Sequence, residues 1–456
     1  MMREQQHTNS QKQDEESSSL TLAERKKRAW GVDEQGVRRI GIKGRHRESP
    51  EGHPFGTVTS VDRWFVNKIL EAAAHPPVNV ALWDGKLICR VEQPVGTLRF
   101  NDRLAIWKLV LNPELHFGDL YSNGRIGFEG DLVGFLEEVY NGLKENGNKG
   151  WFRKLMNWLG HRRIANSLAR ARDNIYHHYD ISNDFYSLWL DNVAMQYTCS
   201  YFPNPEMTLE ESQTAKLHHV CRKLQLKPGQ TVVEAGCGWG GLARFMAKHY
   251  GVTVKAYNIS REQLRYAREE AEKQGLSDKV KYIEDDYRNI RGSYDVFVSI
   301  GMLEHVGTRD YTELGDVIDR CLKPDGRGLI HTIGRNLAGP MNAWIERRIF
   351  PGAYPPTLRE MMDIFEPHRF SIQDVENLRL HYARTLEHWL DRYEENVDTV
   401  RGMFDEEFVR AWRLYLSGSI AAFTTGELQL FQVVFNRAQN NDLPWSRTYL
   451  YDQDAG

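Results

Sequence analysis

The chain has 456 residues and a formal net charge of −3, which argues against a dedicated nucleic-acid binder, because such a domain is usually strongly basic. Its hydrophobic content of 41% and aromatic content of 11% are sufficient for folded cores, and its length predicts two domains with appendages. No stretch of about 20 apolar residues occurs, so the sequence predicts no membrane-spanning helix.

The cysteines and the N-terminus bear on the cellular compartment. The five cysteines are scattered and lack C-x-x-C spacing, so we expect neither a disulfide framework nor a bound metal. The polar N-terminus lacks the apolar region that a secretory signal carries. We therefore expect a cytoplasmic protein, with residues 1–50 as a disordered tail, because their polar and charged side chains bury little apolar surface.

Residues 51–145 show the patterns of a small folded domain. The stretch SVDRWFVNKILEAAA has apolar residues at helical spacing, and LVGFLEEVYNGL is a second amphipathic helix. Between them, VNVALWDG, KLICRV and GTLRF are short apolar runs separated by turn residues, which predicts strands. These patterns predict a small α+β domain without a catalytic constellation, and they leave both lipid handling and dimer contact open as its role.

A basic, aromatic segment follows over residues 146–175. Within 149–172 (KGWFRKLMNWLGHRRIANSLARAR) Lys and Arg alternate with Trp and Leu, and the first acidic residue is Asp173. This composition is typical of a helix that lies on an anionic bilayer, where each Lys or Arg contributes roughly 1 kcal/mol. We expect such a surface-binding linker helix; the alternative is a linker that packs through its Trp face.

From residue 176 to 440, strands alternate with helices. Apolar, β-branched runs occur at TVVEAG, VTVKAYN, VKYIED, YDVFVSIG and GRGLIHTIG, and helical intervals lie between them. The alternation predicts an α/β fold, with a parallel Rossmann-like sheet and crossover helices. We expect residues 340–439 to be a largely helical cap that walls a pocket, and residues 441–456 to be a C-terminal tail.

The most specific local motif is the loop in TVVEAGCGWGGLARF. A strand ends at Glu234, four glycines follow, and a helix begins directly after them, which allows close approach of the backbone to a ligand. A dinucleotide-binding fold would place an acid at the end of the next strand, and VTVKAYNIS has none. The loop instead resembles the first motif of class I S-adenosylmethionine (SAM) methyltransferases. For Cys237 within it we favour a packing role.

Further segments resemble one family, the cyclopropane-fatty-acyl-phospholipid synthases and their mycolic-acid relatives. They occur in order between residues 176 and 437, and they are HHYDISNDFYSLWLD, MQYTCSYF, AGCGWGGLARF, GMLEHVG, LIHTIG, IFPGAYPP and LQLFQVVF. The resemblance implies methyl transfer from SAM to a cis double bond, which creates a carbocation. A base then removes a proton from the transferred methyl group, and the ring closes. In the family that base is a bound bicarbonate.

The resemblance also implies the residues of both sites. The bicarbonate ligands correspond to Cys199, Glu304, His331, Ile333 and Tyr382. The SAM contacts correspond to Tyr197, Thr198, Gly236, Cys237, Gly238, Gly240, Gly241, Asn258, Ser260, Gln263, Asp286 and Tyr287. Family members often carry a cysteine in the late helix where Ser419 stands here. We expect that cysteine to be dispensable, because an anion that serves as the base makes a thiolate unnecessary.

The resemblance therefore predicts a cyclopropane synthase that acts on unsaturated acyl chains of membrane phospholipids. A fatty-acyl C-methyltransferase that leaves methyl- or methylene-branched chains stays open, because branching depends only on where the cation loses its proton. Two other classes are less favoured, a non-catalytic lipid-binding protein and a nucleic-acid or protein methyltransferase. We expect a homodimer at the inner membrane surface and no nucleic-acid partner.

Overall fold

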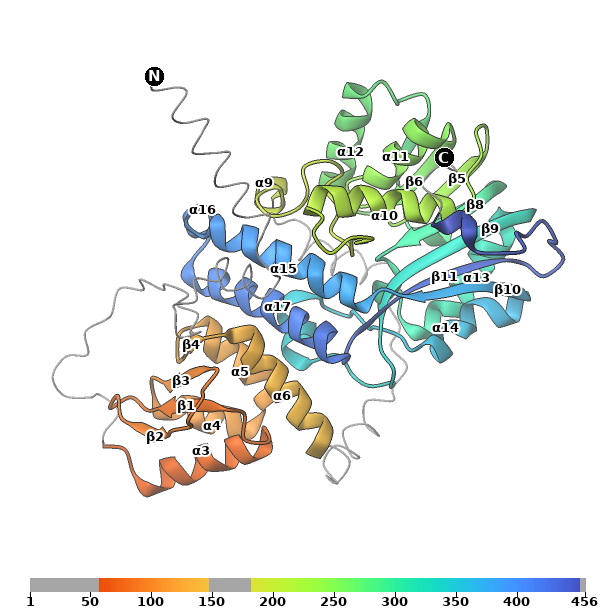
Figure 1. Ribbon diagram of the computed structural model, residues 1–456. Coiled ribbons are helices and arrows are strands. Elements are labelled where there is room, and N and C mark those ends of the chain that lie inside the picture. The colour runs from red at the N-terminus through yellow and green to blue at the C-terminus, as the bar shows by residue number, and fades with distance from the viewer. Residues whose placement is uncertain (1–56, 147–181, 452–456) are drawn as a thin grey trace, which may run out of the picture. The chain divides into compact units, whose positions relative to one another are not determined.

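The computed structural model describes residues 57–146 and 182–451, which form two compact units (Figure 1). The first unit contains the described residues up to Asn146 and also Asp405–Leu414, and the second contains the others. The predicted tail over 1–50 and the basic segment 149–172 lie outside the described residues.

The first unit is built on a four-stranded sheet. Its strands, in the spatial order β2-β1-β3-β4, are β1 (Val78–Ala81), β2 (Leu87–Cys89), β3 (Gly96–Phe100) and β4 (Ile126–Gly130). Its helices are α3 (Ser60–Ala72), α4 (Arg103–Leu111), α5 (Pro113–Ser122) and α6 (Leu132–Asn146). The structure confirms α3, α6 and the first three strands; α4, α5 and β4 are additions to the prediction.

The second unit contains a seven-stranded sheet in the order β10-β11-β9-β8-β5-β6-β7. Its strands are β5 (Thr231–Ala235), β6 (Thr253–Asn258), β7 (Val280–Glu284), β8 (Tyr294–Ile300), β9 (Leu322–Gly334), β10 (Phe370–Asn377) and β11 (Gln429–Arg437). Strands β5 to β9 are parallel, and β11 runs antiparallel to both of its neighbours. The predicted α/β class with a mainly parallel sheet is confirmed.

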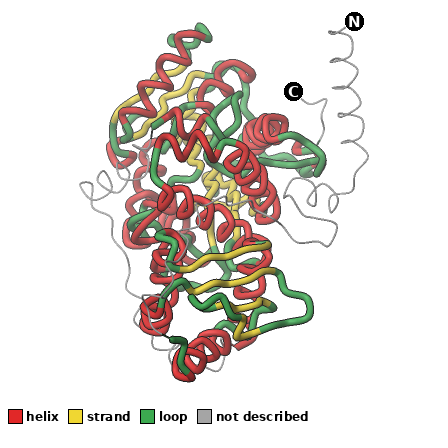
Figure 2. The backbone as a smooth tube through the Cα atoms, turned by 90° about the vertical axis from the view of Figure 1, so that its left-hand side faces the viewer, coloured by secondary structure: helices red, strands yellow, loops and turns green. Residues whose placement is uncertain are grey.

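Helices cover both faces of this sheet, as Figure 2 shows with the strands in yellow and the helices in red. The helices of this unit are α9 (Asn183–Ser187), α10 (Leu209–Lys223), α11 (Gly241–Tyr250), α12 (Arg261–Lys273), α13 (Tyr311–Cys321), α14 (Leu358–Phe365), α15 (Arg379–Glu395) and α16 (Val397–Met403), and α17 (Glu406–Thr425) belongs to it from Tyr415 onward. Val232 packs in the cluster with α10, α11 and α12, whereas Val233 packs with α13 and α14. Successive residues of β5 thus face opposite layers, as the twofold period of a strand requires.

The expectation that residues 340–439 are largely helical is wrong in part. The segment contributes α14 to α17, but it also contributes β10 and β11, which complete the sheet. The run QLFQVVFN is buried at every position of β11. Because this run, which includes Gln429, Gln432 and Asn436, shows no clear twofold alternation, the sequence pattern does not distinguish a fully buried strand from a buried helix.

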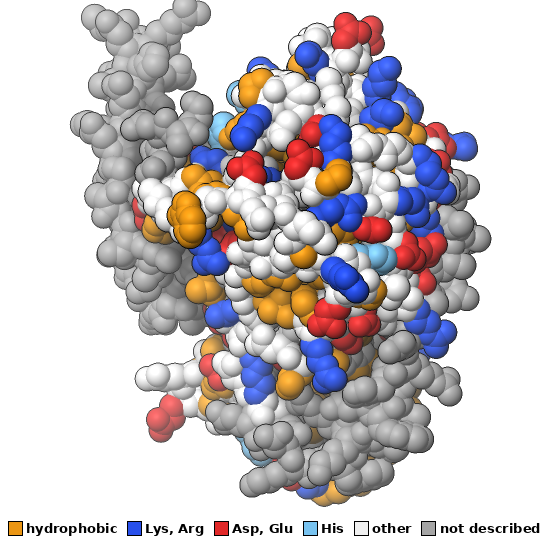
Figure 3. Space-filling view, turned by 90° about the vertical axis from the view of Figure 1, so that its right-hand side faces the viewer, with side chains coloured by type: hydrophobic (Ala, Val, Ile, Leu, Met, Phe, Trp, Pro, Cys, Tyr) orange, Lys and Arg blue, Asp and Glu red, His pale blue; other side chains and the backbone are white. Residues whose placement is uncertain are grey.

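The described surface matches the modest net charge. On the face in Figure 3, Lys and Arg side chains alternate with Asp and Glu side chains. Among residues 57–146 and 182–451, no helix combines the length and apolar character that a bilayer crossing requires.

Candidate active site

A cleft opens at the carboxyl ends of β5, β6, β7 and β8. Gly236, Asn258, Asp285 and Gly301 line it, and each lies at or directly after the end of one of these strands. The strand order reverses between β5 and β8, and open α/β sheets bind their ligands in the crevice at such a point. The cleft is therefore the candidate cofactor site.

Most of the residues predicted to contact SAM line this cleft. They are Tyr197, Thr198, Gly236, Cys237, Gly238, Asn258, Gln263, Asp286 and Tyr287. Gly240, Gly241 and Ser260 are not among the lining residues. The Ser260 hydroxyl instead accepts a hydrogen bond from the backbone N–H of Gln263 and so caps the N-terminus of α12.

The glycine loop is shaped both by packing and by the need for open backbone. Gly240 has φ +73°, and a Cβ there would collide with the ring of Tyr282, whose hydroxyl donates to the Gly240 carbonyl at 2.8 Å. Gly238 has φ +53° with open space where a Cβ would lie, and Asn258 Nδ2 donates to its carbonyl at 3.2 Å. The loop is thus fixed from behind, while its backbone at Gly238 stays open to close approach by a ligand.

Two acidic residues give the cleft its electrostatic character. Glu234, at the end of β5, is buried, and this burial raises the pKa of its carboxyl to about 8. Its Oε2 has no hydrogen-bond partner among the described residues, so the carboxyl is suited to bind an ammonium group. Asp286 is held differently, because Arg288 Nη1 lies 3.2 Å from each of its carboxylate oxygens.

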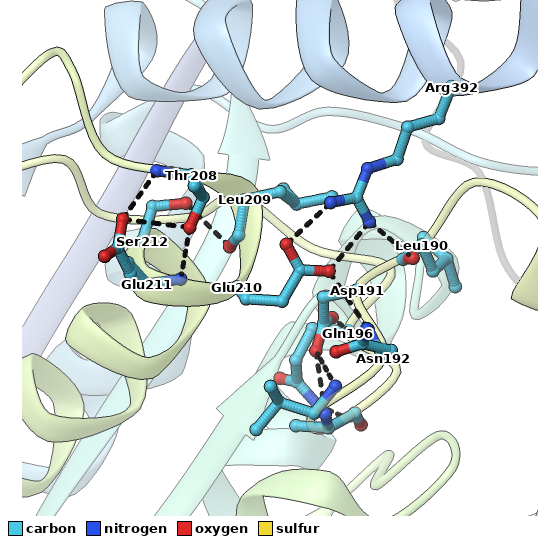
Figure 4. Close-up of polar contacts among 12 residues, drawn as sticks. Leu190, Asp191, Asn192, Gln196, Thr208, Leu209, Glu210, Glu211, Ser212 and Arg392 are labelled. Atoms are coloured by element: carbon cyan, nitrogen blue, oxygen red, sulfur yellow. Dashed lines mark hydrogen bonds and ion pairs between the residues drawn. The ribbon is translucent and has the colours of Figure 1, made fainter. Parts of the chain in front are cut away.

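The residues before α10 form a strap (residues 191–198) along the cleft, anchored as Figure 4 shows. The buried Asp191 carboxylate accepts three backbone N–H groups of the strap, from Val193 at 3.2 Å, Ala194 at 2.7 Å and Gln196 at 2.6 Å. Arg392 of α15 donates to both carboxylate oxygens of Glu210, at 2.6 and 2.8 Å. The same guanidinium donates to the Leu190 carbonyl at 3.1 Å, which ties the start of the strap to two helices.

A buried lysine holds the far end of the strap. Lys216 of α10 donates from Nζ to Gln196 Oε1 at 2.5 Å and to Thr198 Oγ1 at 3.0 Å. Both acceptors belong to residues that line the cleft. Burial lowers the pKa of Lys216 to about 8. No motif in the sequence indicates this lysine, because it touches the cleft only through other side chains.

Several further lining residues were not predicted as contacts. They include Met195, Gln196, Glu234, Tyr257, Arg288 and His305. Position at the end of a parallel strand is the signal that would have found Glu234 and Tyr257.

Three of the five predicted bicarbonate ligands are connected through the backbone at the end of β9. Glu304, in the 3-10 turn Leu303–His305, accepts the backbone N–H of Ile333 on Oε1 at 2.6 Å. His331 is two residues earlier on β9, and its carbonyl accepts the backbone N–H of Gly301. Glu304 Oε2 and His331 Nε2 are both buried without a hydrogen-bond partner in the described part of the chain. Residues on both sides of Glu304, Met302 and His305, line the cleft.

The other two, Cys199 and Tyr382, meet at the start of α15. Cys199 Sγ lies 3.8 Å from the Leu378 carbonyl, which also accepts the backbone N–H of Tyr382. Leu378 in turn donates to the Leu430 carbonyl, and Leu430 is paired with Ile333 in the sheet. This series of contacts runs from Cys199 and Tyr382 across β11 to Ile333.

The thiol and the late serine have no place in the cleft. Burial raises the pKa of Cys199 far above its ordinary value, which keeps the thiol neutral. Ser419 is half-buried on α17 and is not a lining residue. Tyr415, four residues earlier, reaches the cleft instead through a 2.9 Å contact between its hydroxyl and that of Tyr197.

Comparison with known proteins places these features in context. Residues 166–433 match the family described as mycolic acid cyclopropane synthetase, and residues 65–147 match a domain of unknown function, DUF7884. The chain is 38% identical over 337 residues to the cyclopropane-fatty-acyl-phospholipid synthase of Escherichia coli K12, covering 73% of this chain and 86% of that protein. It is 34% identical over 388 residues to a probable fatty acid methyltransferase of Pseudomonas putida, covering 83% and 97%.

Solved structures agree with the sequence relatives. The mycolic acid cyclopropane synthase CmaA1, complexed with SAH and CTAB, matches with a TM-score of 0.56 at 28% identity, covering 58% of this chain and 98% of that one. The cyclopropane synthase MmaA2 from Mycobacterium tuberculosis matches with a TM-score of 0.55 at 29% identity, covering 58% and 97%.

Proposed function

Because this chain belongs to the mycolic acid cyclopropane synthetase family and is a SAM-dependent methyltransferase, we propose that it converts cis double bonds in membrane phospholipids into cyclopropane rings. The observation that carries the proposal is the pair of orphaned polar atoms, Glu304 Oε2 and His331 Nε2, buried beside residues that line the cofactor cleft. Orphaned buried polar atoms are costly, so their presence indicates a missing polar ligand.

The residues of the cleft fit SAM as the methyl donor. The open backbone at Gly238 allows close approach of the amino-acid part, and the unpartnered Glu234 carboxyl suits its ammonium group. In the reaction, the alkene π pair forms a C–C bond to the methyl carbon while the C–S bond breaks and leaves its pair on sulfur. The resulting carbocation loses a proton from the transferred methyl group, and that C–H pair closes the ring. Lining aromatics such as Trp239 and Tyr287 keep water from the cation.

The residues around Glu304 fit bicarbonate as the base. Burial lowers the pKa of His331, so its imidazole is neutral, and Nδ1 accepts from the amide of Gln432 at 3.0 Å. The proton then resides on Nε2, which makes His331 a hydrogen-bond donor and not a base. Burial raises the pKa of Glu304 to about 7, and its free oxygen suits an O–H donor. Bicarbonate offers both an acceptor oxygen and an O–H, and when bound it supplies the group that accepts the methyl proton.

A methyl- or methylene-branched acyl chain is the alternative product, and one observation supports it. The Pseudomonas putida relative that covers most of this chain is described as a probable fatty acid methyltransferase. Both reactions share the methyl transfer and differ only in the carbon that loses the proton. The branched product is therefore the alternative outcome of the same assay.

The cellular setting belongs to the same proposal. We place the enzyme at the cytoplasmic surface of the inner membrane as a homodimer, with residues 51–145 as an accessory domain and 176–440 as the catalytic domain. The Lys- and Arg-rich composition of 149–172 supports contact with anionic lipid.

The test is incubation of the purified protein with SAM and vesicles of dioleoylphosphatidylglycerol, with and without added bicarbonate, followed by mass spectrometry of the released fatty acids. A gain of one CH₂ with loss of the alkene supports ring formation. A gain of one CH₂ with the alkene retained, detected by ozonolysis, assigns the branched product. Unchanged oleoyl chains would remove lipid methylation from the assignment.

A further inference from the structure

The first unit exposes an apolar face on two neighbouring helices. On α3 the exposed large apolar side chains are Val61 and Trp64, and on α4 they are Leu104, Trp107, Val110 and Leu111. The exposed fractions of Trp64, Trp107 and Leu111 are 55%, 42% and 79%. Large exposed apolar side chains that gather in one place mark a site of interaction.

These side chains form one continuous surface. On α4, residues 104, 107 and 111 recur at intervals of three and four, so they share one side of the helix, while Ala105, Ile106 and Leu109 are buried. Phe65 joins the helices, because its ring centroid lies 4.8 Å from that of Trp64 and 4.4 Å from that of Trp107. We call this surface, with Val61, Trp64, Phe65, Leu104, Trp107 and Leu111, the α3–α4 face.

The charges on these two helices are mainly positive. The two carboxylates are already paired, Asp62 with Arg103 at 2.8 Å and Glu71 with Lys68 at 2.5 Å. Arg63 and Lys108 have no ion-pair partner among the described residues, so four cations against two carboxylates leave a charge of +2. A face with this charge is complementary to an anionic surface.

The size and composition of the face favour a bilayer as its occupant. A stable protein–protein interface takes about 20–30 residues from each side, and this face offers six. Trp and Leu bordered by Lys and Arg are typical of helices that lie in the headgroup region of a membrane. We propose that the α3–α4 face inserts into an anionic bilayer and seats the first unit on the membrane. The contact would bring the enzyme to its lipid substrate, and this role rests on the proposed function. The binding to the bilayer itself does not depend on that function.

The proposal assigns a role to the part of the chain that matches a domain of unknown function. Its test compares binding of the full chain to vesicles of dioleoylphosphatidylglycerol by co-sedimentation, without SAM. The Trp64→Ala/Trp107→Ala double variant should bind at least about tenfold more weakly, because two inserted indoles are lost. Leu111→Glu provides a second variant at a position exposed enough to leave folding intact. Trp445→Ala is the matched control, because Trp445 is fully exposed in the second unit.

Each outcome of the test has a definite meaning. Weak binding by both face variants, with normal binding by Trp445→Ala, supports the proposal. Vesicle binding that stays at the wild-type level in both variants, or is absent from the wild type, overturns it. A shift from dimer to monomer in light scattering with vesicle binding intact would assign the face to a protein contact. An assay on detergent-dispersed lipid separates this test from that of the proposed function. The face variants should keep their methyltransferase activity in that assay, because no bilayer is needed. A wild type that forms no product in it would contradict the proposed function and leave the membrane contact unaffected.

Discussion

The side-chain amide of Gln432 on β11 contacts Nδ1 of His331 on β9 at 3.0 Å, and both side chains are buried. The two residues are directly paired in the sheet. Because an amide N–H only donates, this contact makes Nδ1 the acceptor and leaves the proton of the neutral ring on Nε2. The orientation of the proposed anion donor therefore depends on a residue that need not touch the anion.

Gln432→Glu should reverse this arrangement. A carboxylate accepts from Nδ1–H, which turns Nε2 into an acceptor that faces the proposed bicarbonate. We expect turnover to fall at least about tenfold, through a higher KM for bicarbonate, with the affinity for SAH unchanged. The nitrogen chemical shifts of His331 in NMR should report the change of tautomer. Gln429→Glu, a buried glutamine on the same strand, controls for introducing a carboxyl group; equal losses in both variants would contradict the positioning role.

Glu304→Gln should separate cofactor binding from turnover. The amide still accepts the Ile333 N–H but is a poorer acceptor for a bicarbonate O–H, so we expect SAH affinity to persist and turnover to fall about 10²-fold or more. Wild-type turnover should rise with pH through about 7, as the buried carboxyl ionises, and the variant should lack this limb. Undiminished product from the variant would remove Glu304 from the catalytic assignment.

The same raised pKa predicts a stability effect of definite sign. Burial raises the pKa of Glu304 in the folded protein to about 7, above its value in the unfolded chain, so the folded state binds the proton more tightly. The free energy of unfolding should therefore fall as the pH rises from about 4.5 to 7. The free energy of unfolding of Glu304→Gln, compared with that of the wild type, should therefore rise by roughly 2–3 kcal/mol between pH 5 and pH 8. Urea unfolding at these two pH values measures the difference. A difference that does not vary with pH would show that the carboxyl ionises normally.

Ser419→Cys should leave turnover within about twofold of the wild type, because position 419 does not line the cleft. This variant restores the cysteine that related enzymes often carry in the late helix. Steady-state rates with SAM and vesicles provide the measurement. A large gain in rate, sensitive to a thiol-alkylating reagent, would give the cysteine a catalytic role.

The sheet was predictable from local pattern only where strands alternate with helices. Strands β5 to β9 are short apolar runs separated by helical intervals, and the family resemblance that they carry is confirmed by the comparisons. Strand β11 was missed because QLFQVVFN lacks a clear twofold alternation and so fits a buried helix equally well. Strand β10 was missed because FSIQDVEN, at the edge of the sheet, is only partly buried and carries polar residues at most positions.

The cleft was predictable where a residue follows a strand directly, and less so elsewhere. The glycine loop, Asn258 and Asp286 all lie at strand ends. The anchors of the strap have no such signal, because Arg392 and Glu210 are 182 residues apart and meet only in the folded chain. Ser260 caps the N-terminus of α12, and its contact with SAM stays a prediction.

Substitution of Lys216 tests how the strap is held, because a second buried lysine on α10, Lys223, provides a matched control. Lys216 and Lys223 are both buried on this helix, but Lys223 pairs with Glu376, away from the cleft, whereas Lys216 donates to Gln196 and Thr198. Lys216→Met removes two charge-assisted hydrogen bonds to residues that line the cleft, so the Kd for SAH should rise about tenfold in calorimetry. Lys223→Met should lower the melting temperature at least as much while leaving the Kd unchanged, because it removes ion pairs with Asp374 at 3.3 Å and Glu376 at 2.6 Å. Equal effects of the two variants on the Kd would mean that Lys216 acts only through global stability.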